Sequence, residues 1–339
     1  MVGGLHQAAE RRGISSRVVE VVPRERAASR LPFGLPGDRA RLLDELSGAQ
    51  GVIVHGVFQA DVARARRLLE RRLPDVPLVL MPHDAYDDGL FERRRVVKHV
   101  WFTLVERPSL RRSRAILTTA PAHEQWLRRR GVRTTVVMCP LGLTPEERGA
   151  AERVLEGRSA RRRSRTSALV HIGRWDIKEK GLDLSLAAVA ALPKGTAGLR
   201  VVGHTEGQRK RLTSLVHALG APAELVGFVA SVWDELLDAD LLLMPSRKEG
   251  FGLAPLLALS CGVPVLLSSR AGLSEHVSRA DGCVVAEPEV RSTSAALRDA
   301  LAHLDELTDA ARRFAAEKAP ALTYDALLDA ALVALSAPA

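Results

Sequence analysis

Two stretches of the chain carry residues whose types and spacing could bind a phosphate ester. The first runs from Pro245 to Val277, where Glu249, Gly250 and Gly252 precede an apolar segment that starts at Leu253. A glycine turn that enters a helix presents free backbone N–H groups and the positive end of the helix dipole, which suit a phosphate. A carboxylate beside it could accept hydrogen bonds from hydroxyl groups. The pattern indicates a ligand that is part phosphate and part polyol, such as a nucleotide-sugar; the alternative is a tight turn with Glu249 in solvent.

The second stretch, from Gly173 to Asp183, places two cations on one loop. Arg174 and Lys180 are six residues apart, directly after an apolar segment. Together they could neutralise a diphosphate leaving group, whose developing charge is the main obstacle that catalysis must overcome. If this loop is considered alone, the alternative is that both residues are ordinary solvent-exposed cations. The glycine turn after Glu249, which also suits an anion, favours a single site formed by the two loops.

Short apolar segments alternate with helical patterns along the chain, which predicts parallel sheets covered by helices on both faces. The predicted strands are Ser16–Pro23, Gly51–His55, Leu78–Met81, Ala115–Thr119, Thr135–Cys139, Ala168–Gly173, Leu199–Gly203, Glu224–Val229, Leu241–Met244, Val263–Leu267 and Cys283–Ala286. The clearest helices are Leu42–Leu46, Ala60–Leu73, Pro121–Arg130, Gly207–Leu219, Leu253–Leu259 and Tyr324–Leu335. The fold class is α/β, with two doubly wound, Rossmann-like domains. In such folds ligands bind at the carboxyl ends of the strands, so we expect the site in a cleft between the domains.

The length of 339 residues is too great for one ordinary core and predicts two domains. The expected boundaries are an N-terminal domain at 1–150, a basic linker at 151–167, a C-terminal domain at 168–318 and a C-terminal helix at 319–339. The linker is expected because this stretch is highly charged and has no strand pattern.

The composition limits the cellular setting and the partners. No apolar run is long enough to span a membrane, and the first residues lack a secretion signal, so a cytoplasmic protein is expected. Cys139, Cys261 and Cys283 are few and far apart, which indicates reduced core thiols. The formal charge of +9 favours anionic partners. Aromatic residues are few and no nucleic-acid module is present, so no nucleic-acid partner is expected.

An anionic membrane surface is a further possible partner. Between Phe91 and Arg114 the sequence mixes Trp101, Phe102 and Val97 with many arginines, as an interfacial helix does. Peripheral contact with the inner face of the membrane is one interpretation, and an ordinary surface helix is the other.

The start of the chain poses a question about the first sheet. Gly3 and Gly4, followed by a helical pattern, look like the glycine turn after the first strand of a dinucleotide-type unit, yet only Met1 and Val2 precede them. That first strand is central in the usual doubly wound order. We therefore expect either that the natural chain begins upstream or that this sheet lacks a strand.

The motifs together resemble the retaining GT-B glycosyltransferases of family 4. The resemblance rests on HIGRWDIKEKGLD, VVG, LVGFV and ADLLLMPSRKEGFGLAPLLALSCGVPV in the second half, and more loosely on GVIVHGVF, MPHDAY and CPLGL in the first. It covers nearly the whole chain. It implies transfer of a sugar from a nucleoside-diphosphate sugar to an acceptor hydroxyl in glycan, glycolipid or glycosylated-metabolite biosynthesis, with retention at the anomeric carbon. The acceptor, which could be lipid-linked, is unknown.

The resemblance also implies roles for individual residues. Arg174 and Lys180 would bind the donor diphosphate, Glu249 would hold hydroxyls of the donor sugar, and His83 would lie near the reacting sugar. Further donor contacts would come from backbone at Gly3, Gly4, Phe228, Val229, Phe251, Gly252 and Leu253. The two cations would replace a metal, so neither a metal nor another cofactor is expected. Asp238 and Asp240 form a DxD string that we interpret as structural, because they lie at a predicted helix end and strand start.

Two positions depart from the family pattern. The second of the family's paired carboxylates falls on Leu257, which cannot accept hydrogen bonds from ribose hydroxyls, and Leu141 replaces a common asparagine. A catalytically impaired homologue that acts as a binding or partner subunit is therefore an alternative. A sugar-nucleotide epimerase or a polymerising transferase of the same architecture is another, although no acid and base cluster surrounds His83.

Overall fold

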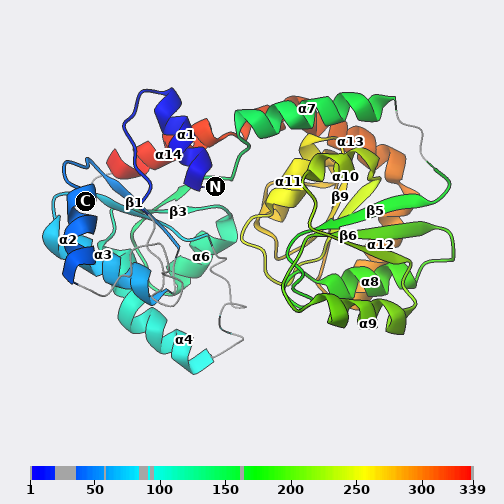
Figure 1. Cartoon of the computed structure of the whole chain (residues 1–339), viewed down its shortest axis with the longest axis horizontal. Helices are drawn as coiled ribbons and strands as arrows, with labels where there is room; N and C mark the ends of the chain where they lie inside the picture. The colour runs from blue at the N-terminus through cyan, green and yellow to red at the C-terminus, as the bar shows by residue number, and fades with distance from the viewer. Residues whose placement is uncertain are drawn as a thin grey trace. The chain divides into compact units, whose positions relative to one another are not determined.

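The computed structural model describes residues 2–19, 36–56, 59–83, 91, 95–160 and 164–336. The chain forms two compact units, one made of Met1–Gly142 with Tyr324–Ala339 and the other of Leu143–Thr323 (Figure 1). The second unit thus begins at Leu143, before the expected boundary at 150, and the C-terminal helix returns to the first unit. The return follows from burial, because α14 (Tyr324–Ser336) encloses Leu327, Leu328 and Ala331 against unit 1.

Unit 1 is built on a parallel sheet of four strands. Its strands, paired in the order of the chain, are β1 (Val52–His55), β2 (Leu78–Met81), β3 (Ala115–Thr118) and β4 (Thr135–Met138). Its helices are α1 (Val2–Arg11), α2 (Pro36–Glu45), α3 (Ala60–Arg72), α4 (Arg95–Trp101), the π-helix η3 (Phe102–Glu106), α5 (Arg107–Arg112), α6 (Pro121–Arg129) and α14. Helix α14 packs on β2, β3, β4 and α1. The core beside β2 and β3 includes Leu69, Phe102, Leu110 and Trp126, from α3, η3, α5 and α6.

The strand predicted at Ser16–Pro23 is wrong where the structure describes it. Residues 16–19 form no strand, and Val18 is half exposed, while the rest of the prediction lies outside the described residues. A run of β-branched residues favours a strand only where a neighbouring strand can pair with it. Of the strands that the structure describes in this sheet, β2 is the one that pairs with β1.

The predicted glycine turn at Gly3 and Gly4 is also wrong. Both residues lie within helix α1, and neither has a positive φ. A Cβ atom added to Gly4 would lie 2.7 Å from the ring of Tyr324, too close for any side chain. The glycine therefore allows α1 to approach α14, which is a packing role that the sequence pattern alone did not reveal.

The expected linker contains a packed helix. Helix α7 (Pro145–Ser159) covers its first half, and it begins with a capping box between Thr144 and Glu147. The helix packs on α10 and α11, and the buried Arg158 donates hydrogen bonds to the carbonyl oxygens of Leu236 and Ala239. High charge hid this helix, because its buried residues are two alanines, one valine and an arginine, which together carry little apolar area. Residues 161–163 lie outside the described part of the chain.

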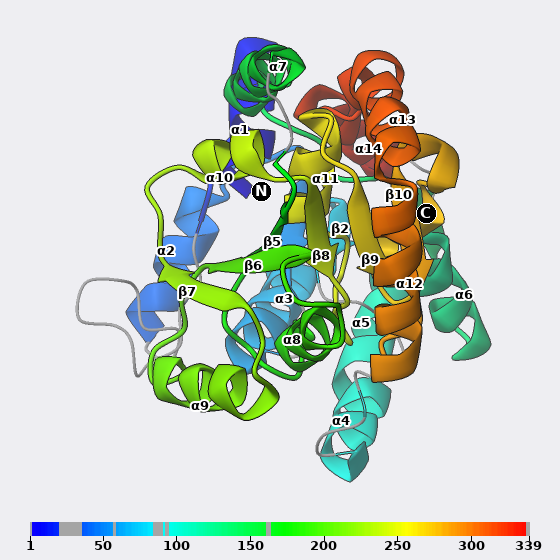
Figure 2. The same ribbon diagram turned by 90° about the vertical axis from the view of Figure 1, so that its right-hand side faces the viewer.

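Unit 2 contains a six-stranded parallel sheet whose strand order reverses in the middle. The order is β10 (Cys283–Ala286), β9 (Val265–Ser268), β8 (Leu241–Met244), β5 (Ser167–Ile172), β6 (Ala197–Val202) and β7 (Ala223–Gly227), as Figure 2 shows. Helices α8 (Leu182–Ala190), α9 (Arg209–Leu219) and α12 (Val290–Ala302) cover one face, and α7, α10 (Val232–Asp238), α11 (Leu253–Ser260) and α13 (Leu304–Glu317) lie on the other. This is the doubly wound order, with its reversal between β5 and β8.

Each unit therefore has the parallel α/β architecture expected from the sequence. The three cysteines are free and buried, and burial raises the pKa of each thiol to about 12. The interpretation of these residues as core thiols is confirmed.

Two buried histidines, His123 and His171, and the half-buried His55 predict a pH dependence of stability. Burial lowers the pKa of His55 and His123 to about 4, and burial with the charge of Lys180 lowers that of His171 to about 3. In the unfolded chain these rings titrate near 6.5, so unfolding takes up protons as the pH falls below that value. We expect the free energy of unfolding to fall between pH 7 and pH 5, by up to about 1.4 kcal/mol per histidine and pH unit, and the apparent unfolding temperature to fall with it.

The histidine contribution can be isolated by its pH window and by one substitution. Carboxylates have unfolded pKa values near 4, so they contribute little between pH 7 and pH 5. His171→Asn should flatten the slope for unit 2. A flat wild-type profile in this range would contradict the prediction.

Candidate functional site

The candidate site lies where the strand order of unit 2 reverses. Two loops leave the carboxyl ends of the adjacent strands β5 and β8: residues 173–181 lead to α8, and residues 245–252 lead to α11. Gly181 has a φ of 65°, and a Cβ atom there would lie 2.1 Å from the carbonyl oxygen of Pro245. The two loops touch through their backbones, which only glycine permits. Ligands bind at such reversal points in doubly wound folds.

The structure brings Lys180 and Glu249 together at this reversal. The Nζ atom of Lys180 donates a hydrogen bond to the Oε2 atom of Glu249 at 2.7 Å, and both side chains are about 15% exposed. Such a pair is largely desolvated, so each charge depends on the other until a ligand replaces one of them. The sequence placed these residues at one sheet edge but did not predict that they would bond to each other.

Arg174 lies on the same loop as Lys180 but in a different environment. Its side chain is 65% exposed, and its Nη2 atom lies 3.4 Å from the Oε2 atom of Glu179. A contact this long and exposed contributes little to stability and leaves the guanidinium available for an anion.

Helix α11 presents its N-terminus at the same edge. Gly252 has a φ of 113° and caps the helix, and the next residues, Leu253 and Ala254, occupy its first turn with Pro255. The backbone N–H groups of a first turn have no intrahelical acceptor and suit an oxyanion. Phe251 is buried, and its ring centre lies 5.8 Å from that of His276. This packing anchors the loop that precedes α11. The predicted backbone donors therefore stand beside Glu249.

Two of the residues expected to contact the donor through their backbone, Phe228 and Val229, lie further along the same edge. Phe228 directly follows β7, and 84% of its surface is exposed, while Val229 is half-buried. The carbonyl of Gly227 accepts a hydrogen bond from the backbone N–H of Gly203 at 2.7 Å, which joins the ends of β6 and β7. The structure thus leaves an aromatic face open at the carboxyl edge of the sheet.

Unit 1 holds the remaining predicted residues. His83 follows β2, and its Nε2 atom lies 2.8 Å from the Nδ1 atom of His55, which ends β1. Burial, followed by His83, lowers the pKa of His55 to about 4, so His55 is neutral at pH 7. Gly3 and Gly4 lie in α1 of this unit. Residues 84–86 of the predicted MPHDAY string lie outside the described residues.

Profiles of two glycosyltransferase groups match the chain, one in each half. "Glycosyltransferase Family 4" matches residues 3–147, and "Glycosyl transferases group 1" matches residues 166–303. The chain belongs to glycosyltransferase family 4. The resemblance noted from the sequence motifs is confirmed.

The chain is 32% identical over 222 residues to a GDP-mannose-dependent alpha-(1-6)-phosphatidylinositol dimannoside mannosyltransferase of Mycobacterium tuberculosis. These residues are 63% of this chain and 57% of that protein, so the match spans little more than half of the relative's length.

Solved structures share the GT-B fold of the family. Sucrose-phosphate synthase from Thermosynechococcus elongatus superposes with a TM-score of 0.70 at 21% identity, over 92% of this chain and 79% of that one. HepE from Anabaena, solved with UDP-glucose, superposes with a TM-score of 0.65 at 17% identity, over 96% of this chain and 88% of that one.

The two departures from the family pattern lie in different environments. Leu257 is half-buried on α11, eight residues after Glu249 in the sequence, whereas Leu141 is buried in unit 1. Asp240 is buried, and its Oδ2 atom accepts a hydrogen bond from the backbone N–H of Ala168 at 2.8 Å. Its predicted structural role is confirmed.

Neither a metal centre nor a membrane span is found in the described residues of this chain. No group of three or more His, Cys, Asp or Glu side chains there is placed to hold a metal ion. No helix in the same residues has both the length and the apolar character that crossing a bilayer requires.

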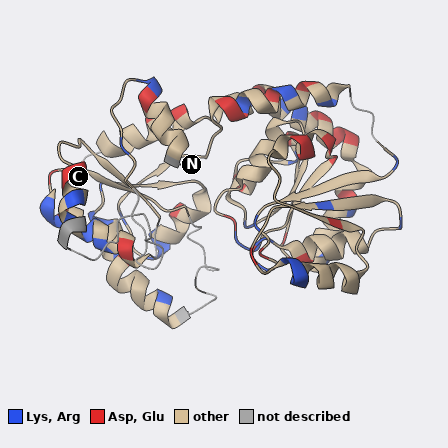
Figure 3. Ribbon diagram, in the orientation of Figure 1, with Lys and Arg blue, Asp and Glu red and all other residues tan. Residues whose placement is uncertain are grey.

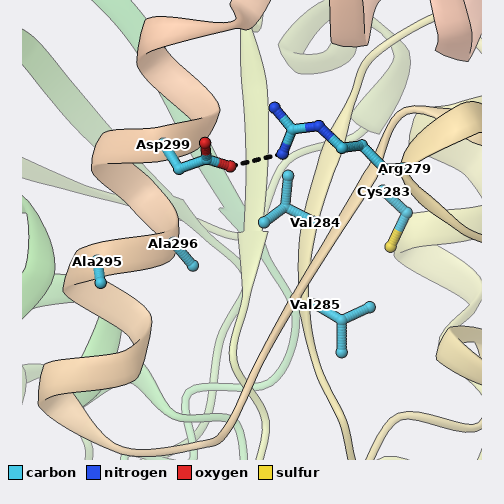
Figure 4. A pocket seen from close by; sticks show the side chains of 7 residues that line it. All are labelled: Arg279, Cys283, Val284, Val285, Ala295, Ala296 and Asp299. Carbon is cyan, nitrogen blue, oxygen red and sulfur yellow. Dashed lines mark hydrogen bonds and ion pairs between the residues drawn. The ribbon is translucent and has the colours of Figure 1, made fainter.

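A hollow of about 500 Å³ lies elsewhere in unit 2, at the outer strand β10. Its lining consists of Arg279, Cys283, Val284, Val285, Ala295, Ala296 and Asp299 (Figure 4). Arg279 precedes β10, and in a parallel sheet the start of a strand lies opposite the carboxyl edge. The hollow is therefore separate from the Lys180 and Glu249 site.

Sequence reasoning missed several residues that shape the site of this family member. Gly181, Asp183, Arg247 and His171 all contribute to the two loops or to the buried layer beneath them. Gly181 carried a detectable signal, because a glycine between charged and apolar residues at a helix start indicates a special backbone conformation. The other three look like ordinary core or surface residues until the fold brings the loops together.

Proposed function

We propose that this protein is a retaining glycosyltransferase that transfers a sugar from a nucleoside-diphosphate sugar to an acceptor hydroxyl. The observation that carries the proposal is the Lys180 and Glu249 pair beside the N-terminus of α11, at the strand-order reversal of a family 4 fold. A cation, free helix amides and a carboxylate together match a ligand that is both a diphosphate and a polyol.

The chemistry proposed for this site needs no side-chain base. The bond between the anomeric carbon and the diphosphate oxygen breaks, and the acceptor oxygen bonds to the anomeric carbon on the same face. The acceptor proton passes to the departing diphosphate oxygen. Lys180, Arg174 and the first amides of α11 would stabilise the charge that develops on the diphosphate, while Glu249 would hold sugar hydroxyls.

A thermal-shift screen of nucleotide-sugars tests the proposal. UDP-glucose and GDP-mannose come first, because HepE was solved with the former and the mycobacterial relative is named for dependence on the latter. A donor at 100 times its Kd should add about 2.7 kcal/mol to the stability of the unit that binds it. Failure of every UDP- and GDP-sugar to bind or to be turned over would sink the proposal.

Leu257→Glu separates an active enzyme from an impaired homologue. If the missing carboxylate weakens ribose binding, restoring it should lower the donor Kd by about tenfold, the value of one good hydrogen-bonded pair. Isothermal calorimetry on the wild type and on Leu257→Gln as a matched control measures this. Binding that appears only in the glutamate variant would favour the impaired subunit.

We also propose peripheral binding to an anionic membrane surface through the helical segment Arg95–Arg112. Four apolar side chains on it are well exposed: Val96 by 75%, Val97 by 64%, Val100 by 51% and Leu104 by 66%. The opposite face is fixed in the core by Phe102 and Leu110. Helix α4 projects from the body of its unit, and its ribbon in Figure 3 carries little charge.

Charge complementarity favours anionic lipid as the occupant of this exposed face. From residue 95 to residue 114 the sequence has five arginines and one lysine against a single glutamate, Glu106, which is buried. Apolar side chains flanked by cations are typical of helices that lie in the headgroup region.

Vesicle co-sedimentation provides the measurement for this surface. The Val97→Glu, Leu104→Glu double variant should bind vesicles containing phosphatidylglycerol at least tenfold more weakly, since each change removes apolar burial and adds repulsion. Val333→Glu is the matched control, because Val333 is 63% exposed on another helix. Equal binding by the double variant and the control, or a dimer through this face in light scattering, would overturn the membrane proposal.

A further inference from the structure

The guanidinium of Arg247 joins the two loops of the site at a point away from the ligand groups. It forms a bidentate pair with Asp183, with Nη1 at 2.8 Å from Oδ1 and Nη2 at 3.1 Å from Oδ2. Its Nη1 atom also donates to the carbonyl oxygen of Lys178 at 3.0 Å. Arg247 belongs to the loop that carries Glu249, and Lys178 and Asp183 bracket Lys180 on the other.

Backbone contacts reinforce the same junction. The N–H groups of Arg247 and Lys248 both donate to the carbonyl oxygen of Glu179, at 2.8 and 3.2 Å. The adjacent Gly181 lies against the carbonyl of Pro245. The segment from Lys178 to Asp183 is therefore held on both sides of Lys180, while the Lys180 side chain itself has one hydrogen bond in the described structure, to Glu249.

The electrostatics show that the Arg247 and Asp183 pair is strongly formed. Partial burial raises the pKa of the Asp183 carboxyl, but hydrogen bonds and charge from Arg247 and Lys178 outweigh burial, so the net pKa is lowered. Asp183 is 17% exposed and Arg247 is 30% exposed, which limits screening by solvent. A planar guanidinium bonded through two nitrogens fixes distance and orientation, which a lysine ammonium cannot do.

We infer that Arg247 and Asp183 are positioning residues that set the distance between Lys180 and Glu249. The pair holds the Lys180 segment against the Glu249 loop, so that the cation and the carboxylate reach the same donor. This inference rests on the proposed function for its kinetic consequence, but its structural consequence can be measured without any substrate.

Chemical labelling of lysines tests the inference in the wild-type protein and in Arg247→Met. Acetylation by an N-hydroxysuccinimide ester, read by mass spectrometry, should modify the paired Lys180 at least tenfold more slowly than the exposed Lys194. In Arg247→Met the rate at Lys180 should rise severalfold, while the rate at Lys194 stays the same. Unchanged labelling of Lys180 would overturn the inference, whatever the activity of the protein.

Kinetics with the donor found in the screen provide the second readout. Arg247→Met and Asp183→Asn should lower kcat about 10- to 100-fold with a smaller change in KM, because a misplaced cation loses charge stabilisation in the transition state. Arg247→Lys should recover part of the loss. Lys178→Met is the matched control: it removes one exposed partner of Asp183 and leaves the bidentate pair, so its kcat should stay near that of the wild type.

The outcomes separate the inference from the proposed function. Faster labelling of Lys180 in Arg247→Met without transferase activity in any protein would support the positioning role and reject the function. Normal kcat in a folded Arg247→Met would overturn the positioning role and keep the function. Should Arg247→Met fail to fold, the milder Arg247→Lys and Asp183→Asn variants carry the same two measurements.

Discussion

Replacing Lys180 with alanine is expected to lower kcat about 10²- to 10³-fold, the usual cost of removing one preorganised group that stabilises developing charge. Lys180 is largely shielded from water and bonds to Glu249 at 2.7 Å, so its charge acts in a medium of low polarity. Steady-state transfer assays with the identified donor measure the effect.

The control for Lys180 is a lysine outside the site. Lys194→Ala removes an exposed lysine in the connection between α8 and β6, at the opposite end of the sheet from the carboxyl edge. Its activity should equal that of the wild type. Turnover in Lys180→Ala within a factor of about three of this control would refute the assignment of Lys180 to the diphosphate.

The effect of losing the Lys180 and Glu249 ion pair on stability must be separated from the effect of losing the cation on catalysis. Lys180→Ala leaves Glu249 without its partner, which costs stability whether or not the protein binds a donor. The Lys180→Ala, Glu249→Gln double variant removes that cost. Its unfolding temperature should recover toward the wild-type value, while its kcat should remain low because the cation is still absent.

Breaking the buried ion pair between Arg66 and Glu106 is expected to destabilise unit 1 by about 3–5 kcal/mol. The Nη2 atom of Arg66 lies 2.8 Å from the Oε2 atom of Glu106, and both side chains are at most 1% exposed. Glu106→Gln leaves the guanidinium charged and without its counterion in the core. Urea unfolding followed by tryptophan fluorescence measures the loss.

The local helix geometry explains why Glu106 has two hydrogen-bond donors, Trp101 and Arg66. The π-helix Phe102–Glu106 interrupts the helical run from Arg95 to Arg112, and the Nε1 atom of Trp101 donates to Oε1 of Glu106 at 2.9 Å. The wider π turn brings side chains five residues apart onto one side. One carboxylate thus accepts hydrogen bonds from both the indole and the Nη2 atom of Arg66, while Nε and Nη1 of Arg66 are buried without a hydrogen-bond partner among the described residues.

A matched variant and a double replacement sharpen the stability prediction. Arg64→Met removes the partly exposed pair with Asp61 on the same helix, α3, and should cost at most about 0.5 kcal/mol. Arg66→Met with Glu106→Leu should recover most of the loss, because apolar replacements leave no buried charge. A Glu106→Gln protein as stable as Arg64→Met would contradict the prediction.

The sequence determined the strands and the loops that follow them. The bounds of two strands, Leu241–Met244 and Cys283–Ala286, match the prediction. A short apolar run that is bounded by proline or glycine is too short for a buried helix, so its pattern indicates a strand. The same patterns placed Arg174, Lys180 and Glu249 after neighbouring strands. Alternation of strands and helices sufficed for this, since both are local properties of the chain.

The sequence patterns failed where a role depends on a partner distant in the chain. Residues 16–19 have the composition of a strand but form none, and Gly4 serves the approach of Tyr324 instead of a phosphate turn. The charged α7 was expected as a linker because its buried residues, two alanines, a valine and an arginine, carry little apolar signal. In each case the deciding contact comes from another element.

The site shows the same division between local and tertiary information. Residue types and spacing established that a cation, a carboxylate and a glycine turn precede helices at one sheet edge. Only the tertiary structure decided that Lys180 bonds to Glu249 and that Arg247 bonds to Asp183, 64 residues away in the chain. Side-chain pairing across loops depends on the distance between two strands, and no local pattern in the sequence encodes that distance.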